Sequence, residues 1–466
     1  MQKRAFGIVL LAVVTGIIIT IFFISRDTGE ACIPAYNASR PSLVLASPPG
    51  YVGFPSLHLV SELNPFEVDR HYWHDGAAAL WGAEDGNFEN VDVRIRGRGN
   101  STWVRGAEKR PLRIRFSTPR HMFGSDYAHR DWLLIANLFD PSLVRNHSAK
   151  YLASLLDNQD FAPMTQFVHL YVNGEYWGVY EFSDERDPAP GRAPLVFDPA
   201  PSLSEYMFEL DGHLIGWRAH EFVEGEDFFT VASEGDVRAY DIRYPRQRDW
   251  DGHLEYLRDF VHRADEAILS RDFDAISAVI DIPSFVDFYL VQELTKNIDV
   301  GTFSVFMSLR GQGDERRIHF GPVWDFDRSS GNTLYWTAPQ FGHASVRNVW
   351  FRNMMAVPEI FDIVAERWNE VKDGPVRQMV DSLYNLATTH EHSFLRNFER
   401  HNVLGASYPY PQWYAMLPQE TREIDTHQGQ VSYLLAWYNQ RIDWLDAFFN
   451  RTDYWINAWW EGVLER

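Results

Sequence analysis

The stretch Gly321-Pro322-Val323-Trp324-Asp325-Phe326-Asp327-Arg328 carries two carboxylates one residue apart, at Asp325 and Asp327. Their neighbours are mostly apolar or aromatic, and a predicted strand, Arg316 to Phe320, comes just before them. Carboxylate oxygens are the ligands that Mg²⁺ and Ca²⁺ prefer in proteins. The stretch therefore predicts a metal site at Asp325 and Asp327.

A further acidic residue, Asp299, lies upstream of this stretch, after a predicted helix from Pro283 to Asn297. Between Asp299 and Asp325, the apolar run Thr302 to Leu309 predicts a strand, and a polar turn, Gly311-Gln312-Gly313-Asp314, joins it to the strand at Arg316 to Phe320. Two acidic positions thus bracket a predicted hairpin.

The first half of the chain predicts strands. Residues 91–96 and 112–116 alternate apolar and charged side chains, the pattern of half-buried strands, and a glycine-containing loop joins them. Asn173-Gly174 separates two further strands, Val168 to Val172 and Glu175 to Phe182, and this dipeptide suits a type I′ hairpin turn. The region therefore predicts two hairpins.

The second half predicts helices, first at His253 to Ser270 and then, rich in Trp and Phe, at 360–371, 376–396 and 431–449. The expected fold class is α+β, with a β-rich N-terminal lobe and a helical C-terminal lobe. The predicted domains are residues 1–30 (anchor), 31–90 (linker entering the first strands near Leu43-Val44-Leu45), 91–350 (catalytic core) and 351–466 (helical extension).

Net charge and aromatic content narrow the class of protein. The chain has 466 residues and a formal net charge of −21, which disfavours binding to nucleic acid. Aromatic residues make up 15% of it, more than a disordered chain carries. A folded protein of enzyme size that does not bind nucleic acid is expected.

The N-terminus predicts a membrane anchor. Residues from Ala5 to Ile24 are almost entirely apolar, and a helix of this length spans about 30 Å, the thickness of a bilayer core. Lys3 and Arg4 precede the run, which places the bulk of the chain outside the cytoplasm. A cleaved signal peptide is the alternative. Cys32 is the only cysteine, so no internal disulfide forms. A single-pass membrane protein of a prokaryotic envelope is expected.

The order of these parts is the one that protein-kinase-like enzymes need: a glycine loop between strands, a helical lobe, then an acid, a hairpin and a second acid. Eight blocks of sequence resemble the spore coat protein H (CotH) kinase family, atypical members of the protein-kinase-like fold, in the family's order. The blocks are Arg96 to Trp103, Lys109 to Ile114, Asp131-Trp132 with Ala136-Asn137, Ser142 to Asn146, Leu170 to Tyr180, Glu209 to Asp211, Gln292 to Asp299, and Gly321 to Asp327.

This resemblance implies a two-lobed, ATP-dependent and metal-dependent kinase that phosphorylates serine on a secreted or surface protein. It implies that Asp325 binds Mg²⁺ or Mn²⁺, that Asp299 is the catalytic acid, and that Asp327 either joins the metal or caps the next turn. It also implies a phosphate-binding loop, whose residues are Gly97, Arg98, Gly99, Asn100 and Ser101.

The cations of the ATP site depart from the family pattern. Arg110, Arg115 and Arg243 stand where relatives commonly carry lysine, and Lys109 is the one lysine close to them in the sequence. We expect Lys109, Arg110, Arg113, Arg115 and Arg243 to supply the charge for ATP, although arginine and lysine are not equivalent at such a site.

Asn137, Arg145 and Asn146 predict a buried polar network that joins two elements, rather than a ligand site. Two other functions stay open. The arginine substitutions favour a non-catalytic surface or assembly protein on a decayed kinase fold. The D-x-D pattern behind a single anchor is also typical of metal-dependent glycosyltransferases, although those place it after alternating strands and helices.

Overall fold

The structure is a computed structural model that describes residues 53–62, 70–99, 102–103, 108–216, 218–246, 249–333, 338–405 and 417–450. These residues belong to one compact unit, which runs from Leu43 to Arg466. The predicted anchor, the predicted strand entry at Leu43-Val44-Leu45, and Asn100 and Ser101 lie outside the described residues. Within the described ranges, no helix has the length and apolar character that crossing a membrane requires.

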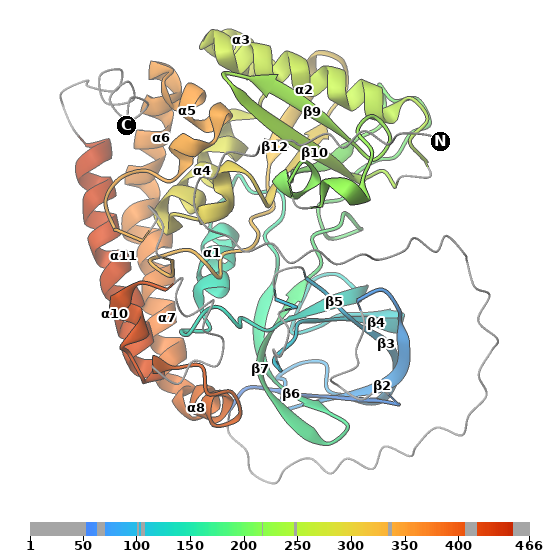
Figure 1. Ribbon diagram of the computed structural model, residues 1–466, viewed down its shortest axis with the longest axis vertical. Helices are drawn as coiled ribbons and strands as arrows, with labels where there is room; N and C mark the ends of the chain where they lie inside the picture. The colour runs from blue at the N-terminus through green and yellow to red at the C-terminus, as the bar shows by residue number, and fades with distance from the viewer. Residues whose placement is uncertain are drawn as a thin grey trace, which may run out of the picture. The chain divides into compact units, whose positions relative to one another are not determined.

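Seven strands of the N-terminal half close into a barrel (Figure 1) in the order β1, β2, β3, β4, β5, β7, β6. They are β1 (Ser56–Ser61), β2 (His74–Trp81), β3 (Phe88–Gly97), β4 (Leu112–Arg120), β5 (His129–Ile135), β6 (Thr165–Val172) and β7 (Glu175–Asp184). Successive side chains of a strand point to opposite faces. Ile95, Ile114, Trp132 and Phe182 therefore pack together inside the barrel, and their neighbours along each strand form its outer face.

Both predicted hairpins of this half are confirmed. β3 pairs with β4 so that Ile95 lies opposite Ile114, and β6 pairs with β7 up to Val172 and Glu175. Asn173 and Gly174 have φ of 52° and 83°. A type I′ turn needs positive φ at both central residues, and asparagine and glycine tolerate it best.

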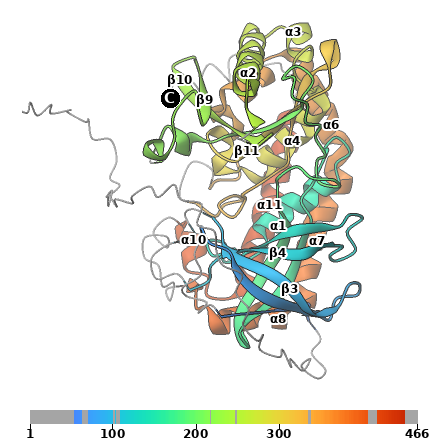
Figure 2. The same cartoon turned by 90° about the vertical axis from the view of Figure 1, so that its right-hand side faces the viewer.

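A second sheet of five strands has the order β12, β11, β8, β10, β9. Its strands are β8 (Tyr206–Leu210), β9 (Phe228–Ser233), β10 (Asp236–Tyr244), β11 (Val305–Arg310) and β12 (Arg317–Phe320). The hairpin of β11 and β12 confirms the prediction, whereas β8, β9 and β10 were not predicted. In Figure 2, α2 (His253–Ser270) lies beside β9 and β10, and its buried side chains join those of the sheet in one core.

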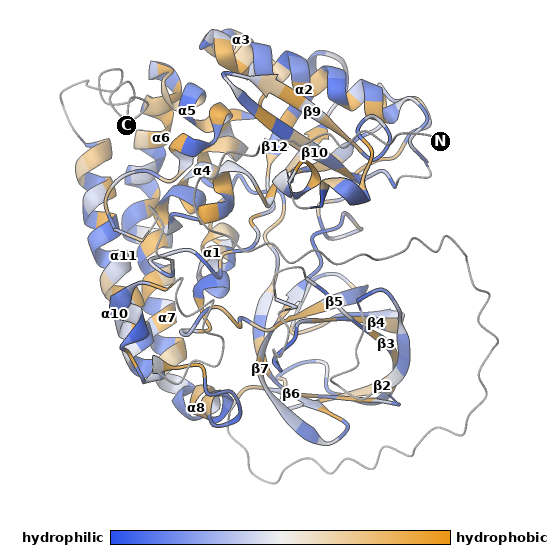
Figure 3. Cartoon of the chain, viewed as in Figure 1, coloured by the Kyte–Doolittle hydropathy of each residue, from blue (hydrophilic) through white to orange (hydrophobic). Residues whose placement is uncertain are grey.

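Helices make up most of the C-terminal part. Besides α2 they are α1 (Arg145–Ser154), α3 (Phe273–Ser277), α4 (Ile282–Thr295), α5 (Val349–Met355), α6 (Pro358–Val371), α7 (Arg377–Thr389), α8 (Glu391–Arg400), α10 (Gln419–Arg422) and α11 (His427–Phe449). α2 carries both hydrophilic and hydrophobic residues (Figure 3), as an amphipathic helix does. In contrast, nearly every residue of α4 is buried, because α1, α6, α11 and β12 all pack against it.

The helix predictions at His253 to Ser270, Pro283 to Asn297, 360–371 and 431–449 are confirmed to within a few residues. The single helix predicted over 376–396 is wrong. Its backbone breaks at His390, with φ −110° and ψ 25°, so α7 ends and α8 begins there. The His390 ring stacks on Phe54 at 4.4 Å, a tertiary contact that helical periodicity does not reveal.

Candidate active site

The Asp325 turn follows β12 and is held by buried neighbours. Trp324 and Phe326 are buried, whereas Asp325 is exposed and has a φ of 64°, in the left-handed region that non-glycine residues seldom adopt. The Phe326 N–H donates to Asn146 Oδ1 at 2.7 Å. That hydrogen bond fixes the peptide directly after Asp325, so the turn presents its carboxylate to solvent.

Asn146 continues a buried polar network between α1 and β7. Its Nδ2 donates to Asn137 Oδ1 at 2.8 Å, and Asn137 Nδ2 donates to Glu181 Oε2 at 3.0 Å. Lys150 Nζ donates to Glu181 Oε1 at 2.7 Å and to Ser183 Oγ at 3.0 Å. The predicted buried network is confirmed for Asn137 and Asn146, and it reaches farther than expected because it ends in a buried ion pair. Arg145, which was predicted to belong to it, is buried but pairs with Asp140 at 2.5 Å instead.

The Lys150–Glu181 pair was not predicted from the sequence, although two signals pointed to it. Lys150 lies one helical turn after Asn146, on the same face of α1. Glu181 is a charged residue inside an otherwise apolar strand run. Both side chains are almost fully buried. The Lys150 ammonium, together with its hydrogen bond, holds the pKa of Glu181 below its usual value despite burial, which acts to raise it.

Asp299 lies in a short 3-10 segment, η5 (Ile298–Gly301), directly after α4. The Asn297 side chain caps this segment by accepting a hydrogen bond from the Asp299 N–H at 3.1 Å. Burial, followed by the negative charge of Asp325, raises the pKa of Asp299 to about 7. The hairpin of β11 and β12 therefore brings the two acids that bracket it in the sequence into electrostatic contact.

Asp327 belongs to the same group of acids. Burial and the neighbouring Asp325 charge raise its pKa well above the usual value, while Arg328 acts in the opposite direction. Within the described ranges, no three His, Cys, Asp or Glu side chains gather as a metal-binding group. Mg²⁺ commonly takes one or two carboxylates and completes its shell with phosphate and water oxygens, so Asp325 and Asp327 fit such a cation only together with a phosphate ligand.

Arg243, predicted to contact ATP, lies in a separate charged cluster on the second sheet. It pairs with Glu209 and with Asp241 at 3.0 Å, and approaches Asp211 at 4.0 Å. Asp211 also accepts from His213 at 2.6 Å. Both Asp211 and His213 act electrostatically on Asp299. The cluster therefore borders the acids of the candidate site, but carboxylates already bind the Arg243 guanidinium.

The glycine loop leads from β3 toward Trp324. A side chain at Gly97 would collide with the ring of Trp103, and Gly99 has a φ of 100°. Both positions therefore need glycine for structural reasons. The Trp103 Nε1–H donates to the Arg98 carbonyl at 2.6 Å, while the Arg98 guanidinium lies 5.6 Å from the Trp324 ring centre. Asp325 acts electrostatically on Arg98, so the loop and the Asp325 turn meet.

Three cations surround the Trp324 ring. Besides Arg98, the Lys150 Nζ lies 4.9 Å and the Arg186 guanidinium 5.4 Å from the ring centre. They come from the glycine loop, from α1 and from the segment after β7. We call Trp324 with Arg98, Lys150 and Arg186 the Trp324 cluster. It places positive charge beside Asp325, where phosphate groups would need it.

Arg113 and Arg115 lie on the outer face of the barrel, opposite Leu133 and Asp131 of β5 respectively. Arg113 pairs with Asp131 and Glu185, each at 3.3 Å, and Arg115 pairs with Asp131 at 2.7 Å. Glu185 also acts on Arg98 electrostatically. Arg113 is therefore connected to the Trp324 cluster through a shared acid.

Lys109 and Arg110 do not join the Trp324 cluster. Lys109 is 2% exposed, its Nζ lies 5.3 Å from the centre of the Tyr180 ring, and it makes no hydrogen bond to any described residue. Burial lowers the pKa of Lys109 to about 7. The Arg110 guanidinium stacks on Trp103 at 4.9 Å. Of the predicted ATP cations, Arg98 is the one in contact with Trp324.

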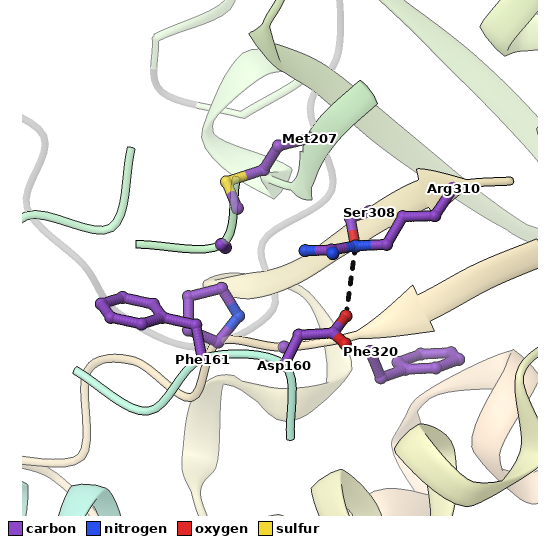
Figure 4. A pocket seen from close by; sticks show the side chains of 9 residues that line it. Asp160, Phe161, Met207, Ser308, Arg310 and Phe320 are labelled. Atoms are coloured by element: carbon purple, nitrogen blue, oxygen red, sulfur yellow. Dashed lines mark hydrogen bonds and ion pairs between the residues drawn. The ribbon is translucent and has the colours of Figure 1, made fainter. Parts of the chain in front are cut away.

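A pocket of about 10 Å³, the space of about one water molecule, borders the segment that leads into the Asp325 turn (Figure 4). Its lining residues are Asp160, Phe161, Ala193, Met207, Ser308, Arg310, Phe320, Gly321 and Pro322. Figure 4 shows Phe161 and Met207 on one side and the ion pair of Asp160 with Arg310, at 3.1 Å, on the other. Ligand pockets usually measure about 300–1,000 Å³, so this one is too small to hold a nucleotide.

Comparison with known proteins adds one finding. Residues 93–445 match the family described as CotH kinase protein, over most of the chain. No curated protein matches the chain. The matched range includes the glycine loop, the Lys150–Glu181 pair and all three candidate acids.

Proposed function

Because the chain belongs to the CotH kinase protein family, we propose that it transfers the γ-phosphoryl group of ATP to a serine of a secreted or surface protein. Membership of this family implies ATP use. The proposed fold is the two-lobed protein-kinase-like arrangement, in which the barrel serves as the β-rich lobe and the elements from α2 onward as the helical lobe.

The observation that carries the proposal is the meeting of opposite charges at Trp324. Arg98 and Lys150 lie beside this ring, and Asp325 follows it directly. Asp299, with its raised pKa, is electrostatically coupled to Asp325. Phosphoryl transfer needs cations for the phosphate oxygens and carboxylates for the metal and the nucleophile, held in fixed positions.

Each residue then has a distinct role. The Arg98 guanidinium and the Lys150 ammonium bind phosphate oxygens, while Glu181 keeps Lys150 in place. Asp299 accepts the proton of the serine hydroxyl, and a pKa near 7 suits a base that works at neutral pH. Asp325, joined by Asp327, would hold Mg²⁺ or Mn²⁺, which when bound neutralises phosphate charge.

Asn146 acts as a positioning residue. Its hydrogen bond to the Phe326 N–H holds Asp325 in the left-handed conformation that exposes the carboxylate. The same side chain connects through Asn137 to Glu181, the partner of Lys150. One network therefore sets the position of both the acid and the cation.

The setting we propose is the cell envelope. The apolar run from Ala5 to Ile24 would anchor the chain as a single span, with the kinase on the extracytoplasmic side. The partner would be a protein with an acceptor serine. The net charge of −21 argues against nucleic acid as a partner.

A second candidate function is a non-catalytic surface or assembly protein on the same fold. It is favoured by the state of three predicted ATP cations: Arg113 and Arg243 are bound by carboxylates, and Lys109 is buried against Tyr180. In such a protein these charges would be purely structural.

Labelled ATP tests the proposal. The full chain is incubated with γ-labelled ATP, Mg²⁺ or Mn²⁺ and a serine-rich acceptor peptide, beside Asp325→Ala and Asp299→Ala. Each variant should lose at least about 100-fold in rate, the lower range for a positioned acid or base. Asp314→Ala is the matched control, since Asp314 is exposed in the turn of the same hairpin. Label transfer that survives both changes would overturn the roles proposed for Asp299 and Asp325. The absence of ATP binding by calorimetry would favour the second function.

A further inference from the structure

Trp73, on the outer face of the barrel, is a second tryptophan surrounded by cations. This residue directly precedes β2, and four guanidinium groups lie within 6 Å of its ring centre: Arg94 at 5.6 Å, Arg96 at 4.6 Å, Arg113 at 5.8 Å and Arg115 at 4.7 Å. We call these five residues the Trp73 cluster. Its four arginines lie close together in a chain whose net charge is −21.

The strand register sets these arginines against one another. Arg94 of β3 lies directly opposite Arg115 of β4, and Arg96 lies directly opposite Arg113. Like charges in directly opposite positions of an antiparallel pair destabilise a sheet. Two such pairs in succession need compensating negative charge.

Among the described residues, acids form ion pairs with only two of these four arginines, Arg113 and Arg115. Arg113 and Arg115 share Asp131, and Arg113 also pairs with Glu185. Arg94 and Arg96 form no ion pair within the part of the chain that the structure describes. The Arg96 Nε is buried without a hydrogen-bond partner there, and burial together with Arg113 lowers the Arg96 pKa. The Trp73 cluster therefore holds two arginines without an ion pair among the described residues, and one of them, Arg96, has a donor without a hydrogen-bond partner there.

The Trp73 cluster extends away from the Trp324 cluster along one strand. Arg98, Arg96 and Arg94 are two residues apart from each other, and a strand rises about 3.3 Å per residue, so Arg94 lies about 13 Å beyond Arg98. Arg94 is exposed. The indole contact leaves the guanidinium N–H groups available, and such groups bind phosphate bidentately.

We propose that Arg94 and Arg96, with Trp73, bind a phosphoserine of an already phosphorylated segment of the protein substrate. This rests on the proposed function, whose product is phosphoserine. The phosphates of ATP are expected at Arg98 and Asp325, whereas the Trp73 cluster lies farther along β3, where Arg94 is exposed. Clusters of arginine are the usual means by which proteins recognise phosphorylated motifs.

Fluorescence anisotropy tests this with the full chain in the absence of ATP. The probe is a short fluorescein-labelled alanine-glycine peptide with two adjacent phosphoserines, beside its unphosphorylated serine twin. The phosphopeptide should bind, and Arg94→Gln and Arg96→Gln should each weaken it about tenfold, the loss expected for one charge-assisted contact. Arg258→Gln on α2, where the arginine pairs among the described residues with its neighbour Asp259 alone, should leave binding unchanged.

Three outcomes overturn the proposal: equal binding of both peptides, binding unaffected by Arg94→Gln and Arg96→Gln, or displacement of the phosphopeptide by ATP with weaker ATP binding in the same variants. The last outcome would assign the Trp73 cluster to the nucleotide. Because no phosphoryl transfer is measured, Asp325→Ala should bind the phosphopeptide normally, so failure of the kinase proposal and failure of this one remain distinct.

Discussion

Two buried lysines meet opposite surroundings in this protein. Lys150, on α1, donates to Glu181 and Ser183 and lies over Trp324. Lys109, before β4, lies against the Tyr180 ring with no hydrogen-bond partner among the described residues. Both are 1–2% exposed. Burial alone therefore does not make a lysine functional; the two lysines differ in whether an acid accepts a hydrogen bond from the ammonium group.

The contrast shows why proximity in sequence is a weak guide to an ATP cation. Lys109 belongs to the block that resembles the family's lysine-containing segment, yet burial lowers its pKa to about 7. Lys150 comes from a helix and Glu181 from a strand, and they meet only in the folded chain. Lys150 has an acid beside it because the fold brings Glu181 of β7 against α1.

The largest expected effect comes from breaking the Lys150 pair. Lys150→Met leaves the Glu181 carboxylate buried without its cation, which should lower the free energy of unfolding by about 3–5 kcal/mol. Label transfer from ATP should also fall strongly, because the Trp324 cluster loses a charge. Chemical denaturation and the labelled-ATP assay measure the two effects.

A second variant separates these effects. Lys150→Met with Glu181→Gln removes the orphaned charge, so most of the stability should return while the activity stays low. If activity returns together with stability, Lys150 is a structural residue and does not bind phosphate.

Lys109→Met should raise the free energy of unfolding, whereas Lys150→Met should lower it. The pKa of Lys109 is about 7 in the folded chain and about 10.5 when unfolded. Between these values the unfolded chain holds a proton that the folded chain lacks, so the free energy of unfolding rises with pH. At about 1.4 kcal/mol per pKa unit, Lys109→Met should stabilise the protein by about 4 kcal/mol at pH 7, and the gain should vanish near pH 10.5.

Denaturant melts of Lys109→Met and of the unchanged protein at several pH values between 7 and 10 provide the measurement. A variant that is destabilised at pH 7, or whose difference from the unchanged protein does not depend on pH, would show that Lys109 is charged and paired in the folded chain.

Local patterns predicted local structure well. The Asn173-Gly174 turn, α2, and the hairpin between Asp299 and Asp325 depend on neighbouring residues and could be read from the sequence. The pairing of β8 with β11 could not, because its strands are far apart in the chain and each is short. The sequence therefore predicted an α+β fold and the hairpin of β11 and β12, but not the five-stranded sheet to which this hairpin belongs.

The residues of the candidate site also fall into two groups: those that the local sequence predicted and those that only the folded chain brings together. Asp299 and Asp325 could be named because each follows a recognisable helix or strand, and the structure brings them into electrostatic contact. Lys150 and Glu181 could not, because a salt bridge depends on which faces of α1 and β7 meet. Lys109 could be misjudged for the same reason, since its burial depends on packing against Tyr180.

Asn146→Ala should have an intermediate effect on stability and activity. Asn146 connects the Lys150–Glu181 pair to the Asp325 turn. The change leaves the Phe326 N–H and the Asn137 Oδ1 without their partner, at a cost of about 1–3 kcal/mol. The rate of phosphoryl transfer should fall as well, with little change in ATP affinity, since Arg98 and Lys150 remain. Asn369→Ala on the exposed side of α6 is the control. Unchanged turnover would mean that the Asp325 turn holds its conformation without Asn146.

The smallest expected effect comes from the Tyr180 ring that packs against Lys109. Tyr180→Phe keeps the ring beside Lys109 and removes only the hydroxyl that donates to the Arg110 carbonyl at 3.1 Å. The free energy of unfolding should fall by about 0.5–1.5 kcal/mol, the net contribution of one hydrogen bond. The pH dependence between 7 and 10 should persist, because the apolar surface that lowers the Lys109 pKa is retained. If Tyr180→Phe removed that dependence, the hydroxyl rather than burial would control Lys109, and the contrast with Lys150 would depend on one hydrogen bond instead of on the presence of an acid.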